Sequence, residues 1–569
     1  MFRNRDDFWL KSARFVRAGT LAMAGWSVFA CLYVMFGRIA YPYDLEWMSG
    51  SILDHVERVQ AGLPLYVPPT SSWIPFLYPP LYYWLSAGLA KIIPLVFACR
   101  TLSIVATFVQ AACVWRLARS RGAAPFWRLV AVGLFFACYQ QTDYWYDIER
   151  PDSLFVAMVL VAAVILDEYK GLAGAAVAGA TLGAAFFAKQ PAAVFVVGAA
   201  TALAVRRDWS RLAVFAGVCL ACIVPMVWRL DRDSGGWFSY YVLRMPVAHG
   251  MSWSPLPLLL QADLPHSLLL LAATLGMVGP FAWRRPREDA EFTGFLAAGF
   301  LASMSSRLHV GGWSNVLMFW TSFAVVAVGI LGSRLEDLVA QLVQNRASSQ
   351  TLMLALPLVA VWQMTTYAYL PADRIPKRAS VRHYRSVVDE VRRLEVAGDV
   401  IALGRGHLTT RRHFHISALI DVVTVEREIP AELLRKIDDR GFAAIVIDSL
   451  DDLRIPLHSE IDGKLFWSVA ANYYVAEALD EELAPPIIGW PARPTWVLLP
   501  RAAPLDERDR MLVGRSVVAE LGLAAMRAHA EDRGTKFPQS PEQTESIARD
   551  VVRRTFERAV DPGDAGYMP

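Results

Sequence analysis

Long apolar runs, separated by short basic or polar segments, fill the first 370 residues. A helix needs about 20 apolar residues to cross a bilayer, and eleven of these runs approach that length. The expected spans are residues 16–36, 101–118, 127–142, 152–167, 171–187, 191–205, 212–228, 266–283, 290–306, 316–333 and 351–370. The pattern therefore predicts an α-helical polytopic membrane protein with about eleven spans.

Basic side chains between the runs indicate which ends face the cytoplasm, because cytoplasmic loops collect lysine and arginine. Clusters lie at the N-terminus, at residues 116–128, at Lys170, and at residues 206–211, 284–287 and 334–346. Most neighbouring clusters are separated by enough apolar chain for one outward and one inward crossing. We therefore expect the N-terminus and these clusters inside, and the polar turns between them outside.

One further apolar stretch, residues 77–97, would invert every later loop if it crossed the membrane. It opens with Pro79 and Pro80, and it carries Lys91 and Pro94. Its aromatic residues suit the membrane interface, so we expect an outer juxtamembrane helix that does not span. A twelve-span topology with the later loops inverted is the alternative.

The chain becomes much more polar after residue 370. Of the 199 residues from there to the end, 60 are charged, against 49 of the first 370. Short apolar strands at residues 400–403 and 444–447, with a helix at 431–440 between them, predict an α/β fold. The expected domains are a transmembrane catalytic domain (1–370), an outer soluble α/β accessory domain (371–504) and a charged, helical to disordered tail (505–569).

Composition excludes several classes of protein. A hydrophobic content of 55% and a mean hydropathy of +0.33 exclude an ordinary soluble enzyme. A net charge of +3, evenly mixed along the polar part, gives no reason to expect a nucleic-acid partner. The six cysteines fall in or beside the apolar runs and lack the spacing of a zinc site or a disulfide framework. No cofactor is predicted with certainty, and a divalent metal ion stays possible.

Polar residues of unusual type gather in the predicted outer loops. They are Asp44, Glu46, Asp147, Glu149, Arg150, Asp152, Lys189, Gln190, His249, Arg307, His309 and Asn315. Carboxylates can remove a proton from a hydroxyl nucleophile, while lysine and arginine can stabilise a phosphate leaving group. This set suits glycosyl transfer from a phosphate-linked lipid. The alternatives without a catalytic role are acidic loops that are merely solvated and a lysine that reaches the lipid headgroups.

Roles follow from these residue types. Lys189 lies between two alanine-rich apolar runs, where a cation is costly unless an anion meets it. We expect it to contact the donor phosphate, helped by Arg150 or Arg307. The catalytic base is expected from Asp44 and Glu46, with Glu46 preferred. Asp147, Glu149 and Asp152 are expected to assist, and Gln190, His249, His309 and Asn315 to contact substrate.

Five motifs in order carry a resemblance. They are Asp44-Leu45-Glu46, Gly62-Leu63-Pro64-Leu65-Tyr66, Tyr78-Pro79-Pro80, Arg150-Pro151-Asp152 and Lys189-Gln190. Over residues 16–333 the chain resembles the GT-C superfamily of integral-membrane glycosyltransferases. The nearest branch is the bacterial one with lipopolysaccharide galacturonosyltransferases, lipid A aminoarabinose transferases and protein O-mannosyltransferases. Leu45 separates the usual acidic pair, and Tyr78 replaces the usual histidine or lysine.

The resemblance implies an enzyme of the bacterial cytoplasmic (inner) membrane, with its N-terminus inside and its C-terminal domain outside. The expected activity is hexosyl or pentosyl transfer, with inversion, from a polyprenyl-phosphate donor to a lipid, glycan or protein acceptor. A transporter or flippase for a lipid-linked substrate is one alternative. A polysaccharide ligase or polymerase that uses the same donors is the other.

Overall fold

The structure is a computed structural model, and it describes residues 2–279, 287–342, 346–448, 453, 462–480 and 482–504. The tail expected at 505–569 lies outside these residues. The chain forms two compact units. As far as they are described, the first comprises residues 2–67, 76–381 and 486–491, and the second comprises residues 68–75, 382–485 and 492–504. The short segment 486–491 thus returns to the first unit.

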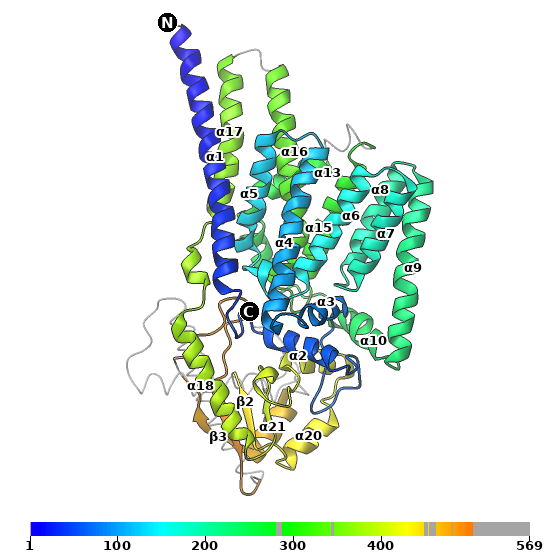
Figure 1. Ribbon diagram of the computed structural model, residues 1–569, viewed down its shortest axis with the longest axis vertical. Coiled ribbons are helices and arrows are strands. Elements are labelled where there is room, and N and C mark those ends of the chain that lie inside the picture. Colours follow the sequence, from blue (N-terminus) through cyan, green and yellow to red (C-terminus); the bar gives the residue numbers. More distant parts are fainter. Residues whose placement is uncertain are drawn as a thin grey trace, which may run out of the picture. The chain divides into compact units, whose positions relative to one another are not determined.

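Each of the eleven predicted spans falls on a helix of the first unit (Figure 1). These helices are α1 (Phe2–Arg38), α4 (Leu95–Ser120), α5 (Pro125–Gln141), α6 (Asp152–Glu168), α7 (Leu172–Phe186), α8 (Ala192–Val205), α9 (Trp209–Asp233), α13 (Leu268–Val278), α15 (Ala290–Arg307), α16 (Met318–Leu342) and α17 (Arg346–Thr366). Among the described residues, five helical stretches are by themselves long and apolar enough to cross a membrane: 11–38, 95–120, 209–233, 256–278 and 314–341.

Shorter helices join the long ones. Between α1 and α4 lie α2 (Ser49–Gln60) and α3 (Leu81–Leu89). Between α9 and α13 lie α10 (Trp237–Ser239), η2 (Tyr240–Arg244), α11 (Met245–His249), α12 (Leu256–Leu258), η3 (Leu259–Asp263) and η4 (Pro265–Ser267). Single turns occur at η1 (Trp145–Asp147), η5 (Ser314–Leu317) and η6 (Pro371–Arg374).

The stretch 77–97 does not form one long helix. Its helix α3 has nine residues, or about 14 Å at 1.5 Å per residue, which is less than half of the hydrocarbon core. Pro94 then begins α4, because proline lacks a backbone donor and suits a helix start. This geometry matches the expected juxtamembrane helix.

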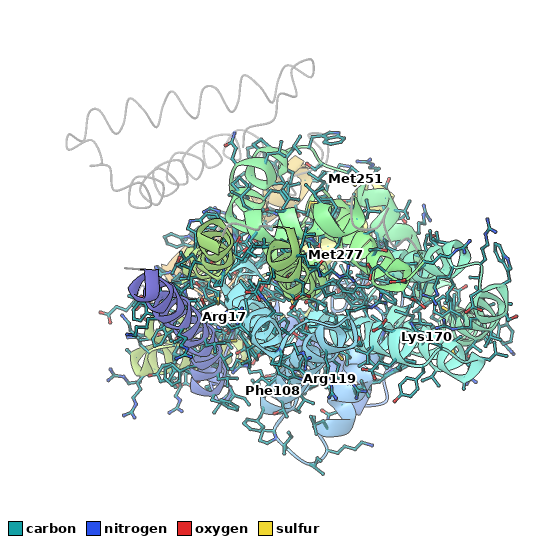
Figure 2. The ribbon with its side chains drawn as sticks, turned by 90° about the horizontal axis from the view of Figure 1, so that it is seen from above. Arg17, Phe108, Arg119, Lys170, Met251 and Met277 are labelled. Atoms are coloured by element: carbon teal, nitrogen blue, oxygen red, sulfur yellow. The ribbon has the colours of Figure 1, made fainter. Side chains whose placement is uncertain are left out.

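Helix α16 is the core of the bundle, and α9 lies at its edge. The apolar window of α16 is entirely buried, whereas only 17% of the corresponding window of α9 is buried. A helix that is apolar on every face needs neighbours or lipid on every face. In the view along the helices (Figure 2), Met277 lies inside the bundle, and Phe108, which is 42% exposed, lies at its rim. The exposed apolar rim is the surface that a bilayer would cover.

Close helix contacts depend on small residues, as is usual among membrane helices. A Cβ added at Gly198 of α8 would lie 2.6 Å from the carbonyl oxygen of Gly294 on α15, and the reverse substitution meets the same limit. The two backbones therefore touch where both residues are glycine.

Ion pairs join the helix ends that carry the predicted inner clusters. Asp289 accepts from Arg334 at 2.8 Å, and Glu291 lies 3.2 Å from Arg211 and 3.1 Å from Arg206. Arg121 also pairs with Asp167 at this end. We call this set the basic-end network. Because each acid serves at least one cation, the network fastens the ends of the helices to one another.

The second unit contains a four-stranded sheet in the order β1-β2-β4-β3. Strands β1 (Val400–Ala402) and β2 (Ala444–Ile447) are parallel, and β4 (Trp496–Pro500) pairs antiparallel with β2 and with β3 (Tyr473–Ala478). Its helices are α18 (Arg378–Glu395), α19 (Ile416–Glu426), α20 (Ala431–Asp438) and α21 (Asp462–Asn472), with η7 (Gly406–Leu408) as a single turn. The two predicted strands and the helix between them are confirmed.

Candidate active site

The predicted outer loops meet at one end of the first unit, which we call the site end. The chain there leaves α1, α5, α7 and α15 and enters α4, α6, α8 and α16, so alternate helix ends gather (Figure 1). Side-chain contacts between residues 100 or more positions apart in sequence confirm this arrangement.

A buried ion pair fixes the loop between α5 and α6. Arg38, the last residue of α1, donates from Nε and Nη2 to the two carboxylate oxygens of Asp147 at 2.8 and 2.5 Å. Tyr139 donates its hydroxyl to the same carboxylate at 2.7 Å, and Arg38 also donates to the carbonyl of Tyr144. A charge removed from water this far requires such a partner. Asp147 therefore holds the loop in place.

A second buried pair fixes the first outer loop. Arg100, in the second turn of α4, donates from Nε to Glu149 at 2.6 Å. Its other nitrogens donate to four backbone carbonyls between residues 38 and 43. Ser49 donates to the remaining oxygen of Glu149 at 3.2 Å. Sequence reasoning missed both Arg38 and Arg100. We call Arg38–Asp147 and Arg100–Glu149 the locked pairs.

Lys189 lies in the turn between α7 and α8 and is buried. Its Nζ donates to Oδ1 of Asp152 at 2.5 Å, and the Asn315 amide donates to the same oxygen at 2.9 Å. Among the described residues the other oxygen of Asp152 has no hydrogen-bond donor. Burial lowers the pKa of Lys189, and the attraction of Asp152 opposes that shift. The anion that meets Lys189 in this structure is therefore an internal carboxylate.

Arg150 is buried between aromatic rings. Its guanidinium carbon lies 5.2 Å from the ring centre of Tyr78 and 5.4 Å from that of Trp145. Nη2 donates to the Tyr78 hydroxyl at 2.7 Å, while Nε and Nη1 make no hydrogen bond within the described part of the chain. Burial opposes its charge, but Tyr78, Glu46 and Asp152 raise the pKa of Arg150 above its ordinary value.

Glu46 completes the group. One of its carboxylate oxygens lies 3.7 Å from Nη1 of Arg150 and accepts from the backbone N–H of Met48 at 3.1 Å. Glu46 is 3% exposed and Asp44 is 6% exposed, so both first-loop carboxylates are buried. Lys189 lies 5.8 Å from the ring centre of Tyr78, so this tyrosine adjoins both cations. We call Glu46, Tyr78, Arg150, Asp152, Lys189 and Asn315 the open cluster.

The other predicted substrate contacts lie elsewhere at the site end. Arg307 donates to Asp263 at 2.8 Å and to the carbonyl of Gly312 at 2.7 Å. Gln190 donates to the carbonyls of Leu77 at 2.6 Å and Val242 at 3.2 Å, so it fixes the chain just before Tyr78.

The two predicted histidines lie beside each other. The ring centres of His249 and His309 are 5.6 Å apart. The two ring nitrogens of His309 lie 2.7 and 2.9 Å from the carbonyl oxygens of Pro246 and Val310. These contacts link the loop before α12 to the loop before α16.

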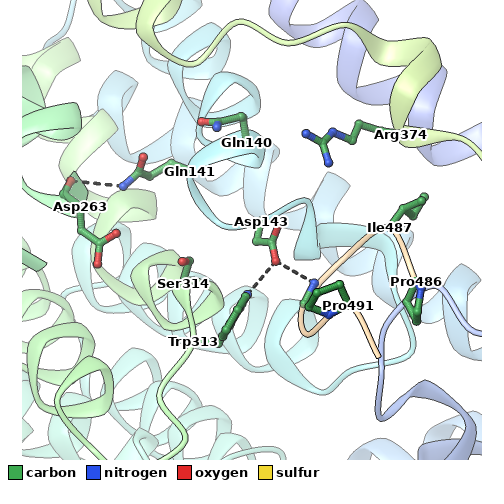
Figure 3. Close-up of a pocket in the computed structure, with 11 residues that line it drawn as sticks. Gln140, Gln141, Asp143, Asp263, Trp313, Ser314, Arg374, Pro486, Ile487 and Pro491 are labelled. Carbon is green, nitrogen blue, oxygen red and sulfur yellow. Dashed lines mark hydrogen bonds between the residues drawn. The ribbon is translucent and has the colours of Figure 1, made fainter. Parts of the chain in front are cut away.

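A cavity of about 420 Å³ opens at the site end (Figure 3). Its polar wall comprises Gln140, Gln141, Asp143, Asp263, Trp313 and Arg374, and residues 486–491 form another wall. This size lies in the range of small-molecule pockets. Neither Asp143, the first residue of the expected second outer loop, nor Arg374 was among the site residues predicted from the sequence.

The described residues contain no group of three or more histidine, cysteine, aspartate or glutamate side chains arranged to hold a metal ion. The six cysteines are free. The possibility of a divalent metal, left open by the sequence, thus gains no support from the side chains that can be described.

Residues 76–307 match glycosyltransferase family 87, a GT-C family. A crystal structure of ArnT from Cupriavidus metallidurans bound to undecaprenyl phosphate aligns with a TM-score of 0.51 at 16% identity, covering 86% of this chain and 99% of that one. The chain has the GT-C fold. The expected resemblance to the GT-C superfamily is thereby confirmed, and the family match supports a glycosyltransferase.

Two further comparisons complete the findings. The oligosaccharyltransferase of Archaeoglobus fulgidus, in a complex with Zn and sulfate, aligns with a TM-score of 0.47 at 11% identity, covering 79% of this GT-C chain and 72% of that one. No curated protein matches the chain.

Proposed function

We propose that this protein transfers a hexose or pentose from a polyprenyl-phosphate-linked donor to a lipid, glycan or protein acceptor. The observation that carries the proposal is the open cluster: two buried cations flank Tyr78, and a buried carboxylate lies 3.7 Å from one of them. The Nε and Nη1 groups of Arg150 have no acceptor among the described residues, and a phosphate oxygen would supply one. ArnT from Cupriavidus metallidurans, which has a similar fold, binds undecaprenyl phosphate, and this supports the role.

The reaction in this proposal is a direct displacement at the anomeric carbon. Glu46 removes the proton from the acceptor hydroxyl, and that oxygen forms a bond to C1 on the face opposite the phosphate. The bond between C1 and the phosphate oxygen breaks, and the electron pair leaves with the polyprenyl phosphate. The configuration at C1 is therefore inverted. Arg150 and Lys189 stabilise the negative charge that develops on the leaving group.

Neighbouring residues orient these groups. Asp152 holds Lys189, and Asn315 holds Asp152, because Lys189 and Asn315 both donate to Oδ1 of Asp152. Asp147 and Glu149 shape the loop that presents Arg150 rather than touching the reacting atoms. In this proposal Gln190, Arg307, His249 and His309 are assigned to contact with substrate, and Asp44 to support of Glu46 in the first loop.

The proposed setting is the cytoplasmic membrane of a bacterium, with the site end outside. Nucleotide sugars are cytoplasmic, so an outer site implies a sugar carried across on the polyprenyl phosphate. Under this proposal residues 371–504 form an accessory domain that covers or guides the acceptor. A chain ending near Leu370 should then keep some donor hydrolysis or transfer, whereas full activity of the isolated C-terminal fragment would contradict this division.

The test is reconstitution of the full chain in proteoliposomes with radiolabelled polyprenyl-phosphate sugars. The proposal predicts label in a lipid, glycan or protein fraction, loss of the label in Glu46→Gln, and the opposite anomeric configuration in the product. Movement of intact donor across the bilayer without a new glycosidic bond would favour a flippase. Mass spectrometry of surface glycans after gene deletion would identify the acceptor, and chain-length changes would favour a ligase or polymerase.

A further inference from the structure

The cavity beside the open cluster is a second feature that the proposed reaction does not yet use. Its polar wall carries two carboxylates, two side-chain amides, one guanidinium and the indole of Trp313 (Figure 3). Carboxylates, amides and guanidinium groups hydrogen-bond hydroxyls, and an aromatic face packs against the C–H groups of a sugar ring. This mixture is unlike the apolar lining expected for a lipid tail.

Asp143 organises the cavity wall. Its Oδ2 accepts from the indole N–H of Trp313 at 2.7 Å and from the backbone N–H of Gly489 at 2.8 Å. Its backbone has a positive φ of 53°, a conformation that costs free energy in a residue other than glycine. The structure thus holds Asp143 in a strained position so that the indole and the segment 486–491 face one another.

Polar groups of this wall remain available to a ligand. The side-chain amide of Gln140 makes no hydrogen bond within the described residues, and its side chain is partly exposed. Gln141 uses its amide nitrogen on the carbonyl of Asp263 at 3.2 Å. The Arg374 guanidinium lies 4.3 Å above the ring of Tyr144, which fixes its position at the rim.

One residue, Gly489, lies between the cavity and Glu46, the proposed base. Glu46 pairs with Ile488 as an isolated parallel bridge, and a Cβ added at Gly489 would lie 3.1 Å from Cγ of Glu46. The N–H of the same glycine donates to Asp143 in the cavity wall. Gly489 therefore contacts both the proposed base and the cavity, and its positive φ of 69° and the tight approach to Glu46 both favour glycine at this position.

We propose that this cavity is a binding subsite for a neutral pyranose ring, held by Asp143, Gln140 and Arg374 and stacked on Trp313. The inference rests on the proposed glycosyl transfer and adds the place and the chemistry of a sugar unit. Of the two wall carboxylates, Asp263 is paired with Arg307, so Asp143 and Arg374 contribute one charge of each sign, which favours a neutral ring over a strongly charged one. The ring could belong to the acceptor glycan or to the donor sugar, which share this chemistry.

The test uses methyl pyranosides of glucose, galactose, mannose and N-acetylglucosamine with the purified full chain in detergent. Saturation-transfer NMR should detect at least one of them. Gln140→Ala should lower the affinity for that pyranoside by about fivefold, which is the effect of losing one hydrogen bond. Trp313→Leu should weaken it further, whereas Gln341→Ala, an exposed amide at the far end of α16, should have no effect.

Competition between the pyranoside and the lipid-linked donor shows whether the bound ring corresponds to the donor sugar or to the acceptor glycan. If the ring belongs to the donor, a polyprenyl-phosphate sugar should displace the pyranoside while undecaprenyl phosphate alone should not. If it belongs to the acceptor, pyranoside and lipid-linked donor should bind together. Absence of binding by all four pyranosides, or binding that is insensitive to Gln140→Ala and Trp313→Leu, would overturn the subsite. Lys189→Ala should leave pyranoside affinity unchanged, so failure of the proposed donor site and failure of this subsite are distinguishable.

Discussion

The locked pairs and the open cluster lie at the same end of the first unit and differ in how their charges are satisfied. Arg38 and Arg100 each donate to a carboxylate within 2.8 Å and to backbone carbonyls. Among the described residues, Nη1 of Arg38 is the one guanidinium nitrogen of this pair without an acceptor. Arg150 has one hydrogen bond, to a tyrosine, and its nearest carboxylate is 3.7 Å away. Buried charge alone therefore does not mark a reactive site, and we propose that the two unused donors of Arg150, beside Lys189, are what the donor phosphate meets.

The largest effect is expected at Glu46. Glu46→Gln should lower the rate of transfer by about 10² to 10⁴ because the amide cannot accept the acceptor proton. Donor affinity should change little. The measurement is single-turnover transfer with donor and acceptor both saturating. If Glu46→Gln and Asp44→Asn each keep near-native rates, the first loop is structural and the base belongs to the second loop.

The next largest effect should fall on stability, and it should fall on a locked pair. Arg100→Met leaves the Glu149 carboxylate buried without its partner, which typically costs about 3 to 5 kcal/mol. The free energy of unfolding in detergent should drop accordingly, and the double variant Arg100→Met/Glu149→Leu should recover part of the loss. Arg150→Met should cost clearly less, since it removes no close pair. Equal destabilisation by Arg100→Met and Arg150→Met would erase the distinction between the two sets.

Substitution of two lysines should affect the affinity for the donor lipid differently. Lys189→Ala should lower the affinity for undecaprenyl phosphate by about tenfold or more, which is the effect of losing one charge-assisted hydrogen bond. Lys170→Ala is the matched control, because Lys170 lies at the other end and pairs with Glu291 at 3.3 Å. The affinity of the Lys170→Ala variant for undecaprenyl phosphate should match that of the wild type. Calorimetric titration of both variants measures the difference, and the same loss in both would contradict the assigned role.

The pH dependence of donor binding should sharpen this result. Burial lowers the pKa of Lys189, so the lysine loses its proton at a pH below the ordinary value of about 10.4. The charged form binds phosphate, so donor affinity should be complete at lower pH and fall as pH rises through the lowered pKa. Lys189→Arg keeps its charge and should remove this alkaline decline. An unchanged decline in Lys189→Arg would assign it to another group.

The smallest effect is expected at Tyr78. Tyr78→Phe removes the hydroxyl that Arg150 contacts at 2.7 Å but keeps the ring beside both cations. Donor affinity should change by about fivefold or less, with no loss of stability as large as that of Arg100→Met. A larger effect on rate than on affinity would instead give the hydroxyl a part in the chemical step.

The sequence predicted the eleven helices and the common end of their polar loops, because apolar periodicity and basic clusters are local signals. It could not predict which charges meet, since Lys189 and Asp152 are 37 residues apart and Arg38 and Asp147 are 109 apart. Arg38 and Arg100 could have been found by asking which anion meets a cation at the end of an apolar run. The return of residues 486–491 to the first unit has no local signature.

The central claim is that Arg150 and Lys189 hold the donor phosphate while Arg38 and Arg100 hold the fold. The most direct measurement is an experimental structure of the full chain bound to undecaprenyl phosphate. We predict phosphate oxygens within about 3.2 Å of Nε or Nη1 of Arg150 and of Nζ of Lys189, with both locked pairs unchanged. A phosphate bound at Arg374 or in the basic-end network, with Arg150 left without an acceptor, would contradict it.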